Sequence, residues 1–343
     1  MSKHSIFSRH PLAGLYAVGD LPDRFRPNPR HVENSATRVS GARHAATTLI
    51  KRDVIITLTS IALSLRHPLQ CWLLRLAVTL SASSALAAAP VPQIVSADNA
   101  RQCDTALSAA RQVATAGGLT FPLNVFSWNV HKVHKPAVLD DFGELADTAH
   151  LIFVQEAVPS RQLPSLADRA FVPAFVPGYV QNETPTGVLT LSRTSHLVHC
   201  RLLSLEPWLR TPKATSITLY PLAGRQKKLL AINLHAINFT FGVSDYQNQL
   251  AALTTLIAEH EGPVIFGGDL NTWSPGRQQV LQHFTSEMAF VAVPFDPDHR
   301  VTVLGRPLDH LYVRDLTWGH TTTHKFTTSD HNPLVATLLS AGS

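Results

Sequence analysis

The stretch Val264-Ile265-Phe266-Gly267-Gly268-Asp269-Leu270-Asn271 is the most informative part of this sequence. Its apolar residues predict a buried strand that ends at a carboxylate and an amide two residues apart, so that both can face one ligand. We expect the two glycines to let backbone and substrate approach closely. The Asp can orient or deprotonate an attacking water, and the Asn can donate to a phosphate oxygen. Taken alone, the segment also fits ordinary turn residues that close a strand.

Two earlier segments have the same design. Asn129 follows Phe126-Ser127-Trp128, and Glu156 follows Phe153-Val154-Gln155, so each strand-like run ends at one oxygen ligand. Hard oxygen ligands of this kind suit Mg²⁺ or Mn²⁺ rather than zinc. Separately, each residue also fits a plain role, Asn129 in a turn and Glu156 as a surface acid.

Further along the chain, imidazoles and carboxylates follow in order. His235 ends an apolar strand-like run and can hydrogen-bond a phosphate oxygen as negative charge builds. An Asp that fixes the tautomer of a His makes a general base, and Asp309 and His331 can form such a pair. Asp330 is then free to help bind a metal. Histidines treated as incidental are His131, His134, His310, His320 and His324.

Short apolar runs alternate with amphipathic segments over residues 121–343, which predicts one mixed α/β domain. Strands are expected at 123–130, 151–155, 187–191, 215–220, 229–234, 264–268, 310–313 and 334–338. Helices are expected at 136–149, 160–170, 244–260 and 275–288. Ser244 is placed to cap the third helix, with Gln247 in the capping-box position.

The order of these segments resembles the endonuclease/exonuclease/phosphatase superfamily over about residues 123–340. The resembling motifs are Trp128-Asn129, Gln155-Glu156, Asn233-Leu234-His235, Gly268-Asp269-Leu270-Asn271, Leu308-Asp309-His310 and Ser329-Asp330-His331. Further stretches, such as Lys213-Ala214-Thr215, are similar to the YafD-like bacterial branch. The resemblance implies a DNase I-like α/β (α+β) fold. That fold is a four-layer sandwich of two packed, mainly antiparallel mixed sheets flanked by helices, with the site at one edge between the sheets.

The resemblance also implies a role for each residue. Asn129, Glu156 and Asp330 would bind the metal. His235 would contact the phosphate, Asp269 and Asn271 would act at the attacking water and phosphate, and Asp309 would orient His331. The chain departs from the family's abasic-site endonucleases at His131, where those enzymes carry an Asp. No equivalent of their active-site tyrosine is located, since Tyr179 and Tyr220 are nearby only in sequence.

These roles predict a Mg²⁺- or Mn²⁺-dependent phosphoester hydrolase, a phosphodiesterase or nuclease, with water activated by Asp269 or by the Asp309–His331 pair. Alternatives within the fold are a monoester phosphatase or a lipid phosphatase or phospholipase, and an alternative from another class is a catalytically silent binding protein. The substrate can be nucleic acid, phospholipid or a small phosphodiester, and we expect a monomer.

Charge bears on the substrate. Residues 1–120 hold 13 Lys and Arg against 6 Asp and Glu, whereas residues 121–343 hold 16 against 18. The excess of basic residues therefore lies in the N-terminal part. The composition of residues 121–343 gives no indication of the basic groove that a nuclease needs. The run Arg225-Gln226-Lys227-Lys228 is expected to be a solvated turn. A phospholipid substrate requires an exposed apolar rim, which a sequence alone does not reveal.

The N-terminal part divides into three predicted segments. Residues 1–53 form a basic, disordered extension. Residues 54–89 are apolar and are expected to be signal-like or membrane-associated. Within them, residues 66–89 resemble a signal peptide, and Ala85-Leu86-Ala87 fits its cleavage pattern. This predicts an exported, periplasmic or membrane-anchored protein, and the alternative is a cytoplasmic protein. Residues 90–120 form a linker with a helix at 104–114. Cys103 and Cys200 can pair in an oxidising compartment if the fold brings them together.

Overall fold

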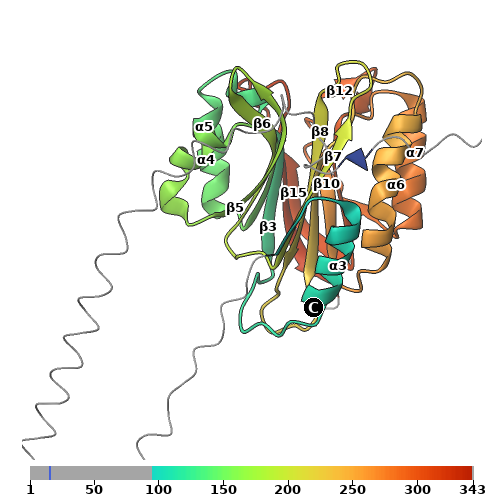
Figure 1. The fold of residues 1–343 in the computed structure, drawn as a ribbon. Helices are drawn as coiled ribbons and strands as arrows, with labels where there is room; N and C mark the ends of the chain where they lie inside the picture. The colour runs from blue at the N-terminus through green and yellow to red at the C-terminus, as the bar shows by residue number, and fades with distance from the viewer. Residues whose placement is uncertain (1–14, 17–94, 342–343) are drawn as a thin grey trace, which may run out of the picture. The chain divides into compact units, whose positions relative to one another are not determined.

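The computed structural model describes residues 15–16 and 95–341, all of which belong to one compact unit. They form two β-sheets packed face to face, with helices covering both outer faces (Figure 1). Helices α4 and α5 cover one sheet, and α3, α6 and α7 cover the other. The expected four-layer sandwich is therefore confirmed. Apart from Leu15 and Tyr16, which form a short strand within the extension expected to be disordered, the segments expected at residues 1–53 and 54–89 lie outside the described residues.

The first sheet runs in the order β1-β7-β8-β9-β10-β14-β11, with β2 beside β7. Its strands are β1 (Leu15–Tyr16), β2 (Val95–Ala97), β7 (Val198–Leu205), β8 (Pro212–Tyr220), β9 (Leu229–His235), β10 (Val264–Asp269), β11 (Val291–Ala292) and β14 (Asp309–Arg314). The β9–β10 and β2–β7 pairs are parallel, and the others are antiparallel.

The second sheet runs in the order β15-β16-β3-β4-β6-β5. Its strands are β3 (Leu123–Asn129), β4 (Leu151–Ala157), β5 (Val172–Gln181), β6 (Thr184–Ser192), β15 (Leu316–Thr323) and β16 (Leu334–Ser340), and only β3–β4 is parallel. Strands β12 (Thr302–Val303) and β13 (Arg306–Pro307) form a separate hairpin. Strands β5 and β15 were not anticipated, because both are edge strands whose prolines or polar residues weaken the apolar signal.

The helices are α3 (Ala100–Arg111), α4 (Val138–Thr148), α5 (Pro159–Ser165), α6 (Ser244–Ala258) and α7 (Pro275–Glu287), with 3₁₀ turns η4 (His131–Val133) and η5 (Ala167–Arg169). The expected cap of α6 is wrong: Val243 is the N-cap, and Ser244 is already helical and makes no capping bond. Ser274 does cap α7 through the backbone N–H of Arg277. None of the described helices has the length and apolar character needed to span a bilayer.

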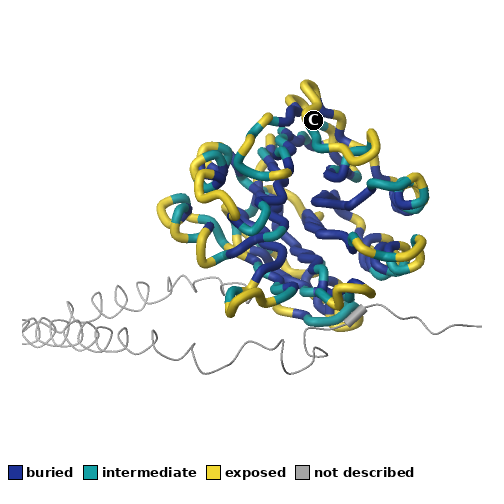
Figure 2. The backbone as a smooth tube through the Cα atoms, turned by 90° about the horizontal axis from the view of Figure 1, so that it is seen from above, coloured by how far each residue is buried: buried dark blue, intermediate teal, exposed yellow. Residues whose placement is uncertain are grey.

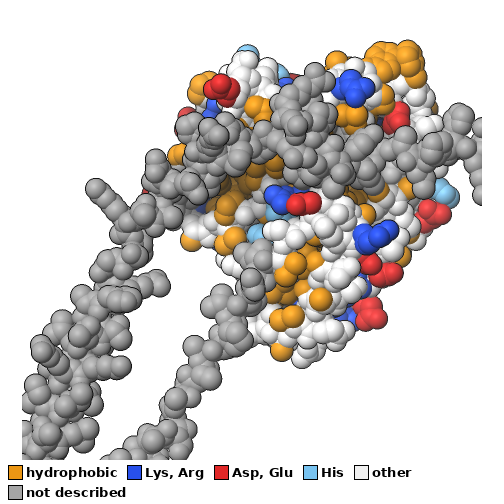
Figure 3. All heavy atoms as spheres, in the orientation of Figure 1, with side chains coloured by type: hydrophobic (Ala, Val, Ile, Leu, Met, Phe, Trp, Pro, Cys, Tyr) orange, Lys and Arg blue, Asp and Glu red, His pale blue; other side chains and the backbone are white. Residues whose placement is uncertain are grey.

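Side-chain alternation along the strands fills three large cores, one in each space between layers, and Val176, Val188, Leu203 and Ala214 form a smaller fourth cluster between the sheets. On β10, for example, Phe266 packs under α6 and α7, whereas Ile265 faces the opposite sheet. Figure 2 shows this burial along the inner segments, with exposed residues in the loops. In Figure 3, hydrophobic side chains also gather on the surface, at the upper right.

The segment expected to be a linker differs most from expectation. Strand β2 pairs with β7, and α3 starts at Ala100 rather than at 104 and packs on the first sheet. The physical reason is a disulfide between Cys103 on α3 and Cys200 on β7, which holds the helix on the sheet. Asn99 caps α3 by accepting from the Gln102 backbone N–H at 2.9 Å.

We expect the double variant Cys103→Ala/Cys200→Ala to lose about 4 to 5 kcal/mol of unfolding free energy, because the bond closes a loop of 97 residues. Urea unfolding of the oxidised full-length chain measures this loss. The wild type treated with a reductant should fall to a similar stability. Equal stability of the variant and the oxidised wild type would contradict the prediction.

Candidate active site

Strand register brings three predicted residues side by side. Asp269 at the end of β10 lies opposite His235, at the end of the parallel strand β9, and opposite Asp309, at the start of the antiparallel strand β14. The amide of Asn129 reaches the same point from the end of β3 in the other sheet. These residues therefore meet at one end of the sandwich, between the sheets, which is where the resemblance would place the site.

Glycine is required at position 268 because the neighbouring strand leaves no room for a side chain, and not because a substrate approaches there. The φ of +133° at Gly268 and the 2.1 Å that would separate a Cβ from the Leu234 carbonyl oxygen exclude any other residue. A Cβ on Gly267 would likewise meet the carbonyl oxygen of His310. The expected close approach thus occurs between neighbouring strands, and it brings β9 and β14 up to Asp269.

The Asp269 carboxylate is the centre of the site. Its Oδ2 accepts a hydrogen bond from Asn129 Nδ2 at 3.0 Å, and lies 3.5 Å from His235 Nε2 and 3.8 Å from His331 Nε2. Its Oδ1 accepts from the backbone N–H of Asn271 at 3.1 Å. The side chain is buried, and burial raises the pKa of this carboxyl group.

His331 pairs with Asp309, as predicted. Its Nδ1 donates to Asp309 Oδ2 at 2.7 Å, and Trp128 Nε1 donates to its carbonyl oxygen at 2.9 Å. Burial opposes charge on the ring, but the carboxylates of Asp309 and Asp269 outweigh it and raise the pKa of His331 to about 10. At neutral pH, His331 is therefore an imidazolium held between two carboxylates.

His235, in contrast to His331, is uncharged. Burial, together with Lys213 and His331, holds its pKa well below the ordinary value, so the ring is neutral. Its Nε2 accepts from Lys213 Nζ at 2.9 Å. Sequence reasoning gave Lys213 no role, although its tripeptide belonged to a resembling stretch. The signal lies in the register of β8 with β9, which pairs Thr215 with Leu234 and so brings Lys213 to the same edge.

Asn271 helps to build the site but is already engaged. Its Nδ2 donates to the Ala236 carbonyl oxygen at 3.0 Å, which ties the end of β10 to the residue after His235. Beneath it, two other motif residues join the sheets: Gln155 Nε2 donates to Asn233 Oδ1 at 2.7 Å, and both side chains are fully buried. The amides in these motifs therefore have structural as well as chemical roles.

Two predicted metal ligands stand apart from this cluster. Glu156 Oε2 lies 3.1 Å from Lys132 Nζ, and Lys132 also hydrogen-bonds to the Tyr179 hydroxyl. Burial opposes the charge of Lys132, but Glu156 and Tyr179 together outweigh it and raise the pKa of the lysine. Asp330 is mostly exposed, with Oδ1 3.5 Å from Nδ1 of His131. Lys132, Tyr179 and His131, which sequence reasoning left without roles, thus line the edge of the site, whereas Tyr220 is a core residue.

Two groups of residues offer ligands to a metal. Asp269, Asp309 and His331 place their ligand atoms within 4.8 Å of one another. The high pKa of His331 disfavours this group, because the ring must lose a proton to ligate. Glu156 offers a carboxylate with a cation, the Lys132 ammonium, already beside it, and Asn129 ends the neighbouring parallel strand. Oxygen donors of this type fit Mg²⁺ or Mn²⁺.

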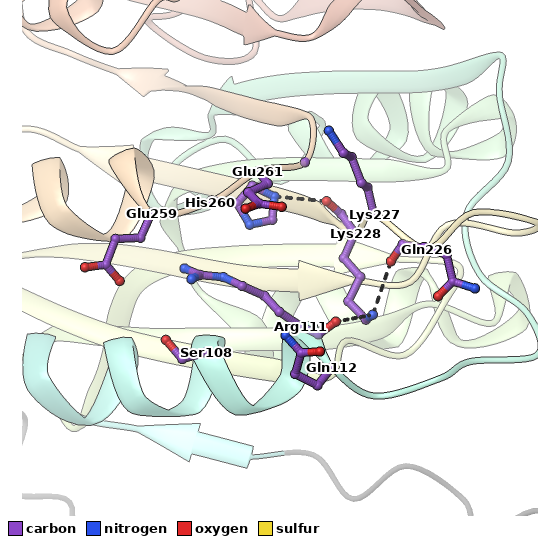
Figure 4. Close-up of a pocket in the computed structure, with 10 residues that line it drawn as sticks. Ser108, Arg111, Gln112, Gln226, Lys227, Lys228, Glu259, His260 and Glu261 are labelled. Atoms are coloured by element: carbon purple, nitrogen blue, oxygen red, sulfur yellow. Dashed lines mark hydrogen bonds between the residues drawn. The ribbon is translucent and has the colours of Figure 1, made fainter.

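Two pockets flank the structure at opposite ends. A polar hollow of about 500 Å³ lies beside the site, lined among others by Lys132, His134 and Arg161. Another, at the start of β9, includes Arg111, Lys228 and His260 (Figure 4). There Lys228 is buried and donates to the carbonyl oxygen of Arg111 at 3.0 Å, so the expected solvated turn is wrong for this residue. The carbonyl groups at the end of α3 need such a donor.

Replacing Asp309 with Asn should lower the pKa of His331 from about 10 towards 6.5, because the main opposing charge is removed. Imidazole NMR titration of the chain in EDTA measures this value, with Asp315→Asn at the exposed end of β14 as control. Because the pKa is raised on folding, the pair stabilises the fold fully below pH 6.5, and this contribution is lost as pH rises through about 10. An unchanged His331 pKa in Asp309→Asn would refute the assignment.

Comparison with known proteins gives a consistent identification. The model of the endonuclease/exonuclease/phosphatase family matches residues 126–331. A UPF0294 protein of Erwinia tasmaniensis is 38% identical over 217 residues, which cover 62% of this chain and 80% of that protein. A crystal structure of an endonuclease/exonuclease/phosphatase from Beutenbergia cavernae is similar with a TM-score of 0.51 and 17% identity, covering 64% of this chain and 72% of that one. This chain belongs to the endonuclease/exonuclease/phosphatase family.

Proposed function

We propose that the protein is a Mg²⁺- or Mn²⁺-dependent hydrolase that cleaves phosphodiesters by in-line attack of water. Family membership supports phosphoester hydrolysis in general. The observation that carries the finer proposal is the buried Asp269 carboxylate, surrounded by an amide, a neutral imidazole and an imidazolium. Carboxylate and cationic groups at one point suit both activation of water and binding of a phosphate.

The side chains divide the work by charge. Lys213 and His331 direct N–H groups and positive charge towards the space beside Asp269, where they can stabilise charge on the phosphate oxygens, and His235 orients the Lys213 ammonium by accepting its hydrogen bond. Glu156 and Asn129, with Asp330 at the edge, would hold the metal. A bound Mg²⁺ or Mn²⁺ would supply Lewis-acid stabilisation of the phosphate charge.

The charge states favour Asp269 over His331 as the general base. Asp269 takes one proton from water as the oxygen bonds to phosphorus and the bond from phosphorus to the leaving oxygen breaks. The leaving alkoxide takes a proton from the His331 imidazolium. The proton on Asp269 then returns to His331, whose Nε2 lies 3.8 Å away. The balance is one diester and one water consumed, with one monoester and one alcohol formed.

Asp269→Asn should lower the rate of bis(para-nitrophenyl) phosphate hydrolysis by about a hundredfold or more, because the base is lost while the shape is kept. The rate with Mg²⁺ should exceed the rate in EDTA. Asp315→Asn serves as the control, and circular dichroism checks folding. Full activity of Asp269→Asn, or equal rates with Mg²⁺ and EDTA, would sink the proposal.

We also propose that the protein is exported or held at the outer face of a membrane. The signal-like residues 66–89 motivate this, and the Cys103–Cys200 disulfide supports it, since such bonds persist in oxidising compartments. Residues 1–94 fused to a reporter phosphatase that is active only outside the cytoplasm should give activity, and residues 1–53 should not. An inactive 1–94 fusion would argue for a cytoplasmic protein.

A further inference from the structure

Large exposed hydrophobic side chains are concentrated around the candidate active site. The structure describes ten of them, and seven lie at the end of the sandwich that holds the site. The seven are Val180, Trp208, Leu209, Phe239, Phe241, Val303 and Leu304. They come from the ends of β5, β7 and β9 and from the β12–β13 hairpin, which precedes Asp309. A random scatter of surface hydrophobics would not favour one end, so this grouping calls for a ligand.

Four of these residues lie on the two loops that follow β7 and β9 and are here called the aromatic rim: Trp208, Leu209, Phe239 and Phe241. The rings of Trp208 and Phe241 stand 4.0 Å apart between centroids, although they come from different loops. Phe241 remains 79% exposed and Trp208 55% exposed. Their mutual contact therefore leaves most of both rings in water, which is unfavourable without a further partner.

Hydrogen bonds from buried side chains hold the two loops of the rim together. Buried Glu206 joins the two loops, because its Oε1 accepts from the backbone N–H groups of Asn238 at 2.7 Å and Phe239 at 2.9 Å. Its Oε2 accepts from the hydroxyl of Thr211, at the end of its own loop, at 2.9 Å. Buried Arg277 donates to the carbonyl oxygen of Asn238 at 2.7 Å. Since these bonds fix the loops, the exposure of the aromatic rings is built into the fold.

The same loops carry the chemistry. Phe239 follows His235 by four residues, and the loop that carries Trp208 leads directly into β8, where Lys213 contacts His235. A surface that touches the aromatic rim therefore lies next to the groups that would bind phosphate. Glu206, which fixes the rim, has no contact with Asp269, His331 or Asp309 in the structure described, so its role is separate from theirs.

The charge around the aromatic rim distinguishes between nucleic acid and lipid as its ligand. A nucleic-acid groove combines aromatic side chains with many Lys and Arg residues. The aromatic rim has Arg210 alone among its neighbours within the 206–211 and 236–243 loops, and residues 121–343 carry two more acidic than basic residues. Tryptophan, phenylalanine and leucine with a single arginine are typical of side chains that insert at the boundary of a lipid bilayer.

We propose that the aromatic rim seats the protein on a lipid surface and that the adjacent site hydrolyses the phosphodiester of a phospholipid headgroup. This inference rests on the proposed function. Water adds to phosphorus, the bond to one ester oxygen breaks, and that oxygen leaves as an alcohol with a proton that the attacking water gives up. The products are an alcohol and a phosphomonoester. The polar hollow beside Lys132 is placed to receive the headgroup.

Contact is tested with the full-length chain and vesicles of equal parts phosphatidylethanolamine, phosphatidylcholine and phosphatidylglycerol, at high ionic strength to screen Coulomb attraction. Brominated lipid should quench tryptophan fluorescence more in the wild type than in Trp208→Phe, since the difference is due to Trp208 alone. Equal quenching in both would overturn the proposal. Both chains retain residues 54–89, so any binding by that segment cancels.

Hydrolysis is tested by the ratio of two rates, on these vesicles and on soluble bis(para-nitrophenyl) phosphate. Trp208→Ser/Phe241→Ser should lower this ratio at least about tenfold, because two apolar insertions are lost. Val95→Ser/Val291→Ser, which removes exposed valines remote from the site, should leave it unchanged. Single-stranded DNA is assayed in parallel.

The outcomes separate this inference from the proposed function. Cleavage of the soluble diester without cleavage of vesicle lipid overturns the lipid assignment and leaves the hydrolase intact. Loss of DNA cleavage in the rim variant, with vesicle cleavage unaffected, identifies the rim as a base-stacking surface and also overturns it. Cleavage of neither the soluble diester nor lipid, together with Trp208 quenching, refutes the hydrolase while retaining the membrane contact.

Discussion

A carboxylate buried between two sheets is the constraint around which this end of the molecule is built. Asp269 is 3% exposed, and a buried charge is costly unless it is paired and hydrogen-bonded. Its partners come from three different elements: Asn129 from the opposite sheet, His235 from the neighbouring strand and His331 from the loop before β16. These contacts require β3, β9 and β10 to end at the same height in the sandwich.

That requirement explains the residues that do no chemistry. Gly268 has no side chain because β9 passes too close, and the Gln155–Asn233 bond fixes one sheet against the other below Asp269. Asp309 holds His331 as a cation facing Asp269. The site is preorganised in this sense, since the groups are already held by packing and by bonds to one another.

Residue patterns predicted eight of the strands and most of the residues that meet around Asp269, but they missed β7, which lies inside the first sheet. A buried strand has a strong apolar signal, and a polar residue at its end is easily seen, as at Asp269 and His235. The pattern was too weak for edge strands such as β5, whose prolines interrupt it. Lys213 was missed because its neighbour, His235, lies across a strand pair whose register is a tertiary property.

Exposure is likewise a tertiary property. A Phe or Trp in a loop looks in sequence like any core residue, so the aromatic rim appears only when the loops are placed and fixed by Glu206. The position of α3, in the segment expected to be a linker, also depends on a distant residue, because a disulfide joins its Cys103 to Cys200. Local patterns thus identified most of the residues that meet around Asp269, whereas the contact of Lys213 and the exposure of the aromatic rim depend on how distant segments meet.

The most direct test of the account is the position of Mn²⁺ and phosphate in a crystal of the full-length protein, located by anomalous scattering. We predict the metal at the Glu156 carboxylate, with Lys132 displaced, and the phosphate beside His235, Lys213 and His331. A metal bound by Asp269, Asp309 and His331, with none at Glu156, would contradict the assignment of Asp269 as base and His331 as acid.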